Sequence, residues 1–167
     1  MIVLCILLGI VCIFDYTGGK IPNLFPVLIA LWGVARSFWN GGLVGVGIYV
    51  IVIVVVLLVL FPIFRIGGLG AGDVKLLSVC SGFFDLSGIF SFLFISMLIS
   101  AIFSLIPLIK ERNLRERFSY FCEYCVAVVQ SGRWYLYMPQ GTKGLMRGVC
   151  MSGPVLCSVL LGLGGLY

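Results

Sequence analysis

The chain has 167 residues, of which 62% are hydrophobic and only 10% are charged, and it carries a net charge of +5 with a mean hydropathy of +1.23. Ordinary globular domains are about half apolar. This composition therefore predicts an all-α integral membrane protein with about six transmembrane helices, and it excludes a sizeable soluble domain. The absence of histidine excludes histidine metal sites and Ser-His-Asp triads.

The first apolar run, residues 1–14, has no basic residue ahead of it. A secretory signal peptide starts with such residues, so we expect this run to be retained as a membrane helix. Fourteen residues are short for a bilayer, and the helix should therefore continue past Asp15, placing this acid at the membrane boundary. The Ile21-Pro22-Asn23 segment then predicts a break and a restart, with Asn23 capping the next helix.

Two further apolar runs, residues 24–39 and 43–64, predict the second and third membrane helices. The later run is rich in β-branched residues, which would suit a buried strand in a soluble protein. It nevertheless holds 22 consecutive uncharged residues, and this length fits a membrane helix better.

A glycine-dense loop follows, in which Gly68, Gly70 and Gly72 lead to a single carboxylate at Asp73. Glycine has no side chain to keep another backbone away. We therefore expect the loop to let an extended peptide approach Asp73. Lys75 comes two residues later, and we expect its ammonium group to reach the lipid headgroups from the end of the next helix.

The fourth and fifth helices are predicted over residues 74–84 and 89–109, with Asp85 in the turn between them. A charged and interfacial insertion follows over residues 110–147, and the last helix is predicted over residues 149–167. The whole chain, residues 1–167, is then a single membrane-embedded domain.

Within the insertion, residues 118–138 mix aromatic, apolar and charged side chains, as in a helix that lies in the headgroup region. Cys122 and Cys125 form the only C-x-x-C pair, and no second pair completes a zinc site. We interpret all seven cysteines as small buried hydrophobes. An interfacial redox or metal role for this pair is the alternative.

Basic residues are distributed unequally between the two predicted sides of the membrane. If the loop after Asp15 is cytoplasmic, ten of the eleven lysines and arginines lie on that side and only Arg36 lies opposite. The positive-inside rule then places Asp15 and Asp73 together at the cytoplasmic face and Asp85 at the far face.

Asp15 and Asp73 are therefore expected to form one site. Two carboxylates held close together cannot both ionise easily, so they share a proton, and such a pair can activate water and protonate a leaving group. Which acid takes which role stays open. Alternatively, each acid only caps a helix end, or the two bind a proton or cation in a small transporter with broken helices.

Two patterns resemble a known family: Asp-x5-Ile-Pro-Asn, which starts at Asp15, and Gly-x-Gly-x-Gly-Asp-Val-Lys, whose acid is Asp73. Together they resemble the type IV prepilin peptidases, and most closely their short branch that serves tight-adherence (Flp-type) pili. The resemblance covers most of the first 85 residues and, more loosely, residues 151–154 at the start of the last helix.

This resemblance implies an intramembrane aspartic protease of the GxGD type with Asp15 and Asp73 as its catalytic pair. The implied partners are a small prepilin with a basic cytoplasmic leader and the lipid bilayer of the inner membrane, and no nucleic acid. Cleavage is implied near the cytoplasmic interface, without a metal or cofactor, because the acid pair and water are sufficient.

Overall fold

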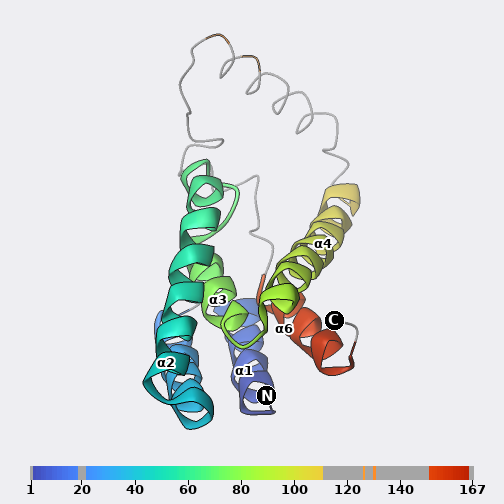
Figure 1. Cartoon of the computed structure of the whole chain (residues 1–167). Coiled ribbons are helices and arrows are strands. Elements are labelled where there is room, and N and C mark those ends of the chain that lie inside the picture. The colour runs from blue at the N-terminus through green and yellow to red at the C-terminus, as the bar shows by residue number, and fades with distance from the viewer. Residues whose placement is uncertain (1, 19–21, 111–125, 127–129, 131–150, 166–167) are drawn as a thin grey trace.

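The computed structural model describes residues 2–18, 22–110, 126, 130 and 151–165 (Figure 1). Most of these residues are helical, and none of them lies in a strand. The bounds of the helices, in chain order, are α1 Ile2–Gly18, α2 Leu24–Arg65, α3 Ala71–Ser81, α4 Leu86–Lys110 and α6 Ser152–Leu163.

Helix α2 reverses direction at Gly42. Its 42 residues would extend about 63 Å if straight, twice the hydrocarbon thickness of about 30 Å, but Gly42 has a φ of 58° and a ψ of −145°. A Cβ atom built at Gly33 would lie 2.1 Å from the Tyr49 hydroxyl, and one built at Gly45 would lie 2.5 Å from the Ser37 carbonyl oxygen. In both pairs the two partners are equally far from residue 41 along the chain, which is the pairing that an antiparallel hairpin produces. The two arms of this hairpin correspond to the second and third predicted helices.

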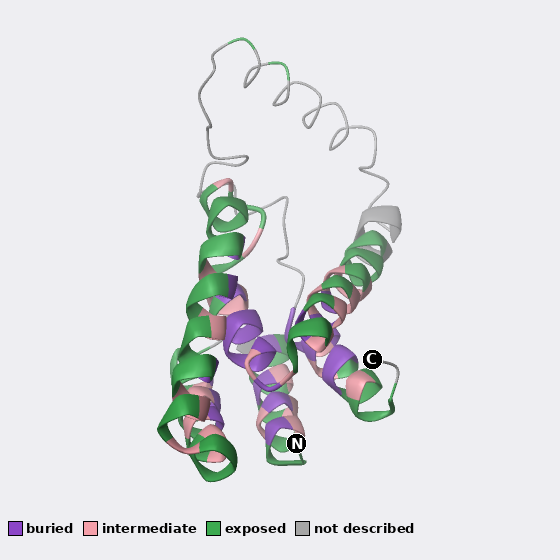
Figure 2. Cartoon of the chain, viewed as in Figure 1, coloured by how far each residue is buried: buried purple, intermediate pink, exposed green. Residues whose placement is uncertain are grey.

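Helix α3 is the centre of the structure, packed mainly against α2 (Figure 1). Apart from Lys75, every residue from Val74 to Ser81 is buried (Figure 2). The hydroxyl groups of two of its serines are satisfied locally, because Ser78 donates to the Val74 carbonyl and Ser81 to the Ser78 carbonyl, both at 2.7 Å. A helix that is buried all round forms a core, and its 11 residues are too few to span a bilayer.

The first and last described helices pack against each other, and α6 also packs against α4. On α6, Val155 and Val159 are fully buried, and the Ser158 hydroxyl donates to the Phe92 carbonyl of α4 at 3.1 Å. Because the first and last parts of the chain meet in this way, residues near both ends of the sequence can contribute to one site.

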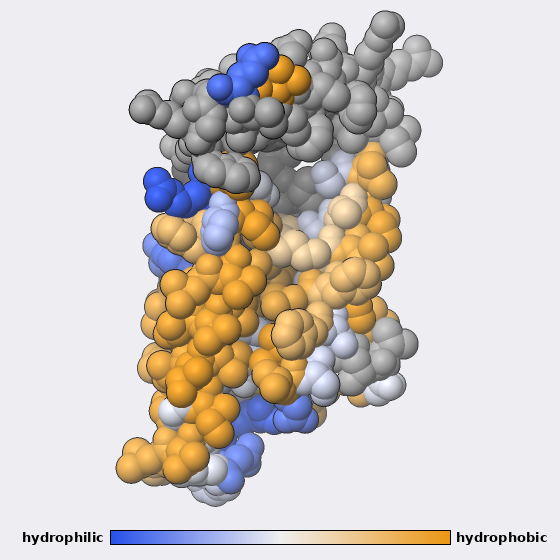
Figure 3. All heavy atoms as spheres, turned by 45° about the horizontal axis from the view of Figure 1, so that its top comes forward, coloured by the Kyte–Doolittle hydropathy of each residue, from blue (hydrophilic) through white to orange (hydrophobic). Residues whose placement is uncertain are grey.

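Most of the described surface on the face shown in Figure 3 is apolar. Two helices, α2 and α4, are long and apolar enough to cross a membrane, and α1 and α6 are shorter apolar helices. Large hydrophobic side chains such as Leu58 and Phe94 are more than half exposed, whereas five serines and Asp15 are buried. Together with the composition, this distribution indicates a membrane protein.

Several predicted boundaries shift in the structure. The sequence predicted that Gly72 and Asp73 lie in a loop. In the structure α3 begins at Ala71, so both residues lie in its first turn. Helix α6 ends at Leu163 because Gly164 and Gly165 follow, the latter with a φ of 81°. The predicted interfacial segment, residues 118–138, lies outside the described residues apart from two isolated positions.

The prediction that all cysteines are buried is wrong for Cys157, which is exposed on α6. Cys80 is buried, and Cys5 and Cys12 are half-buried. The C-x-x-C pair and Cys150 lie outside the described residues.

Candidate active site

Asp15 is buried because it continues the apolar stripe of α1. Leu4, Leu8 and Val11 are fully buried, and the next position on the same face, four residues further, is Asp15. Its side chain is only 6% exposed. The periodicity that packs α1 against the core therefore also brings a carboxylate into the interior, where an ionisable group is costly and becomes a candidate for function.

The Asp15 carboxylate meets the start of α6. The Ser152 hydroxyl donates a hydrogen bond to Asp15 Oδ2 at 2.6 Å, and the Ser152 backbone N–H points to the same oxygen at 3.4 Å. Sequence reasoning did not single out Ser152. The available signal was a serine directly before Gly153-Pro154, where a helix could begin after a polar segment.

Asp73 is the third residue of α3, and Gly70 takes the N-cap position with an extended backbone, φ −73° and ψ 150°. The Asp73 carboxylate accepts a hydrogen bond from the Gly70 backbone N–H, as the acid does in a capping box. The alternative that Asp73 is itself the N-cap residue is therefore wrong. A Cβ atom built at Gly70 would lie 2.7 Å from Asp73 Oδ2, so glycine leaves the space that this carboxylate occupies.

The two acids act on each other electrostatically. Asp73 lies at the loop end of α3, outside the helices long enough to cross a membrane. The pKa of Asp73 is raised to about 6, chiefly by burial and secondly by the nearby Asp15, while the Gly70 N–H partly opposes the change. Asp15 on α1 is thus near enough to act electrostatically on Asp73 of α3, and Asp73 holds a proton more readily than a free aspartate. That the two acids form one catalytic pair stays a prediction.

A hydrogen bond joins the two sequence motifs at their exposed edge. Lys75 Nζ donates to Asn23 Oδ1 at 3.1 Å. Asn23 takes the N-cap position of α2 but makes no side-chain cap bond, so its predicted capping role is wrong. Lys75, expected among lipid headgroups, is held against the first motif. The Pro22 carbonyl accepts the Phe25 N–H at 3.2 Å, and Ile21 lies outside the described residues.

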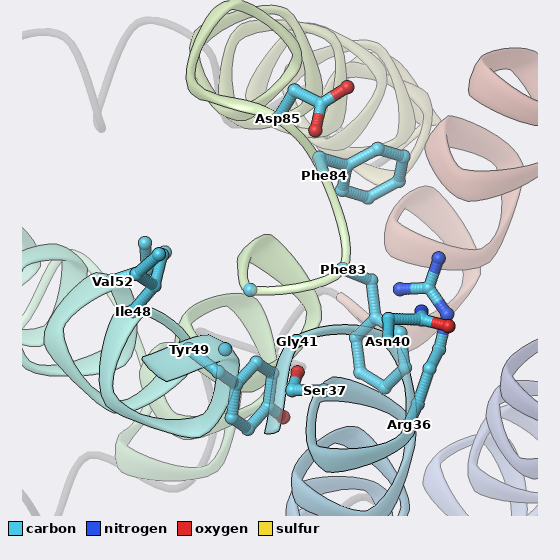
Figure 4. A pocket seen from close by; sticks show the side chains of 12 residues that line it. Arg36, Ser37, Asn40, Gly41, Ile48, Tyr49, Val52, Phe83, Phe84 and Asp85 are labelled. Atoms are coloured by element: carbon cyan, nitrogen blue, oxygen red, sulfur yellow. The ribbon is translucent and has the colours of Figure 1, made fainter. Parts of the chain in front are cut away.

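A separate pocket of about 300 Å³ lies at the hairpin turn of α2 (Figure 4). It is lined by both arms of α2 and by residues 82–85, which follow α3, and the Arg36 guanidinium lies 5.7 Å from the centre of the Phe83 ring. Asp15 and Asp73 do not line it, and Asp73 sits at the other end of α3. In the part of the chain that the structure describes, no group of three cysteine or acidic side chains could hold a metal ion.

Comparison with known proteins identifies one family. The model of the type IV leader peptidase family matches residues 2–105, a range that contains both acids and the two sequence motifs. No curated protein and no solved structure gives a significant match.

Proposed function

Because the chain belongs to the type IV leader peptidase family, we propose that it is an aspartic endopeptidase that removes the leader peptide from type IV prepilins of the Flp-like class. The observation that carries this proposal is the electrostatic coupling between two carboxyl groups from different helices, one of which has a pKa raised to about 6. A pair of acids that shares one proton is the arrangement that activates water in aspartic proteases.

The proposed reaction needs one protonated and one ionised acid. The ionised carboxylate takes a proton from water, whose oxygen attacks the scissile carbonyl carbon, while the protonated carboxyl donates a hydrogen bond to the carbonyl oxygen. The tetrahedral intermediate collapses when the leaving amine receives a proton from the acid pair, and the carbon–nitrogen bond breaks. The raised pKa of Asp73 favours it as the initial proton donor, and Asp15 is then the base.

The substrate reaches the acids along the glycine segment in this proposal. Gly68 and Gly70 are exposed and Asp73 is half-buried, so an extended peptide can lie beside the carboxyl group without meeting side chains. Gly72 contributes less than expected, because it lies inside α3. We further propose that the site faces the cytoplasm in a multi-pass protein of the inner membrane, on the basis of ten basic residues against one.

The test is cleavage of a co-expressed Flp-type prepilin in membranes by the wild-type chain and by Asp15→Asn and Asp73→Asn. Asparagine keeps the shape of aspartate but cannot supply the acid. We expect each variant to lose about 100- to 10,000-fold in cleavage rate at normal abundance, because acid–base catalysis contributes about 10²–10⁴-fold per group. Cleavage by both variants at the wild-type rate would refute the proposal.

The transporter alternative uses the same two acids. Family membership favours hydrolysis, and the experiment separates the two functions. A wild-type chain that is abundant in membranes but inert toward several prepilins would favour ion or proton transport.

A further inference from the structure

The start of α6 has an unusual cap. The first N–H groups of a helix have no partner within the helix, and a side chain at the N-cap position often accepts a hydrogen bond from one of them. Met151 takes that position in α6 and makes no side-chain cap bond. The acceptor comes from another helix, since the Ser152 N–H points to Asp15 Oδ2 at 3.4 Å.

The Ser152 hydroxyl strengthens this contact. Some serines inside the helices of this chain donate to the carbonyl group four residues earlier, as Ser78 does to Val74 and Ser96 to Phe92. Ser152 is the first residue of α6, so no carbonyl of its own helix stands four residues before it. Its hydroxyl donates across to Asp15 at 2.6 Å.

Burial of both residues makes the hydrogen bond between Ser152 and Asp15 hard for water to replace. Ser152 is 0% exposed and Asp15 is 6% exposed, so water does not readily replace the serine as donor. A hydrogen bond to an ionised acceptor is roughly twice as strong as a neutral one. With Oδ2 held by two donors of one residue, rotation of the carboxylate about its bond to Cβ is restricted, and the direction of the second oxygen is set.

We propose that Ser152 is a positioning residue, which orients the Asp15 carboxylate for proton transfer through its hydroxyl group. The inference rests on the proposed function, because it assigns to Ser152 an effect that acts through Asp15. It differs from a purely structural contact in one respect: loss of the hydroxyl slows the chemical step and leaves substrate binding unchanged.

The experiment measures kcat and KM of the purified full-length chain with a synthetic Flp-type prepilin. The variants are Ser152→Ala, which removes the hydroxyl donor, and Ser152→Thr, which keeps it. Gly153→Ala is the matched control, because a Cβ atom there meets Cys12 Sγ at 3.8 Å, an ordinary van der Waals distance. Abundance in membranes and the melting temperature are measured for each variant.

We expect Ser152→Ala to lower kcat about 10- to 100-fold, as misplacement of a reacting group by about 1 Å does, with KM within about twofold of the wild type. Ser152→Thr should recover most of kcat, and Gly153→Ala should match the wild type. If the added methyl group of threonine lowers abundance in the fully buried site, Ser152→Cys takes its place. Its weaker thiol donor should give an intermediate kcat.

Three results would overturn the inference: wild-type kcat in Ser152→Ala, a loss confined to KM, or a donor-keeping variant (Ser152→Thr, or Ser152→Cys in its place) as slow as Ser152→Ala at normal abundance. Asp15→Asn, measured in parallel, separates this failure from that of the proposed function. If Asp15→Asn is inactive and Ser152→Ala is not, only the role of Ser152 is wrong. If Asp15→Asn cleaves normally, the proposed site itself is wrong.

Discussion

Replacing Gly70 with alanine should reduce cleavage without unfolding the protein. The added Cβ atom would lie 2.7 Å from Asp73 Oδ2, whereas carbon and oxygen atoms in contact are normally about 3.3 Å apart or more. The carboxylate must then move by about 0.6 Å, the difference between these two distances. Alanine itself fits the backbone, because Gly70 has a φ of −73° and a ψ of 150°, an extended conformation that any residue adopts.

The expected loss of cleavage rate follows from this displacement of the carboxylate. Catalytic groups must be held within about 0.5 Å of their productive positions, and a misplacement of about 1 Å costs about 100-fold in rate. We therefore expect Gly70→Ala to cleave about 10- to 50-fold more slowly than the wild type. The atom that moves is the end of a flexible side chain, so the free energy of unfolding should change by less than about 1 kcal/mol.

The assay is the initial rate of prepilin cleavage in membranes, normalised to enzyme abundance. Gly47→Ala is the control, because a Cβ atom there meets nothing within 4 Å; it should cleave at the wild-type rate. Wild-type cleavage by Gly70→Ala would refute the reasoning, since it would show that the space beside Gly70 is not needed by Asp73. A loss of rate that only parallels a loss of abundance would refute it too.

Two further predictions concern pH and packing. Because the pKa of Asp73 is raised to about 6, its proton is lost as the pH rises through that value. For a substrate peptide with no group that titrates between about pH 5 and 8, kcat/KM should therefore fall about tenfold per pH unit above about pH 6 to 7; a flat profile up to pH 8 would contradict the shared proton. Gly33→Ala should lower the free energy of unfolding by about 1–3 kcal/mol through overpacking, since its Cβ atom would lie 2.1 Å from the Tyr49 hydroxyl. Thermal unfolding in detergent checks this value, with Gly47→Ala again as the control, and an unchanged melting temperature for Gly33→Ala would show that the two arms of α2 do not touch at this point.

The sequence allowed prediction of features that depend on local pattern. The apolar run that ends near Asp15 predicted α1, because a bilayer needs about 20 helical residues and the helix therefore had to continue past the acid; α1 indeed ends at Gly18. The placement of Asp15 and Asp73 on one membrane face was inferred from the charge distribution, which depends on alternation of helices across a bilayer, and it stays a prediction. Both inferences needed only spacing along the chain and the chemistry of single residues.

Contacts between distant segments could not be predicted in this way. Nothing in the local pattern indicates that Lys75 reaches Asn23, 52 residues earlier, or that Tyr49 fills the space beside Gly33. The beginning of α3 was misplaced for a different, local reason. Glycines at positions 70 and 72 suggest a loop by propensity, but the Asp73 carboxylate caps the Gly70 N–H and stabilises a helix that contains Gly72.

The bond between Asp15 and Ser152 also sets an order of events during synthesis. The two residues are 137 positions apart, and at about 5–20 residues per second the ribosome needs about 7–27 s to make the chain between them. During this interval α1 already carries its acid, but the helix whose Ser152 donates to that acid does not exist. Both carboxyl groups are therefore present in the nascent chain well before the site is complete, and proteolytic activity should appear only when the last helix has packed against the first.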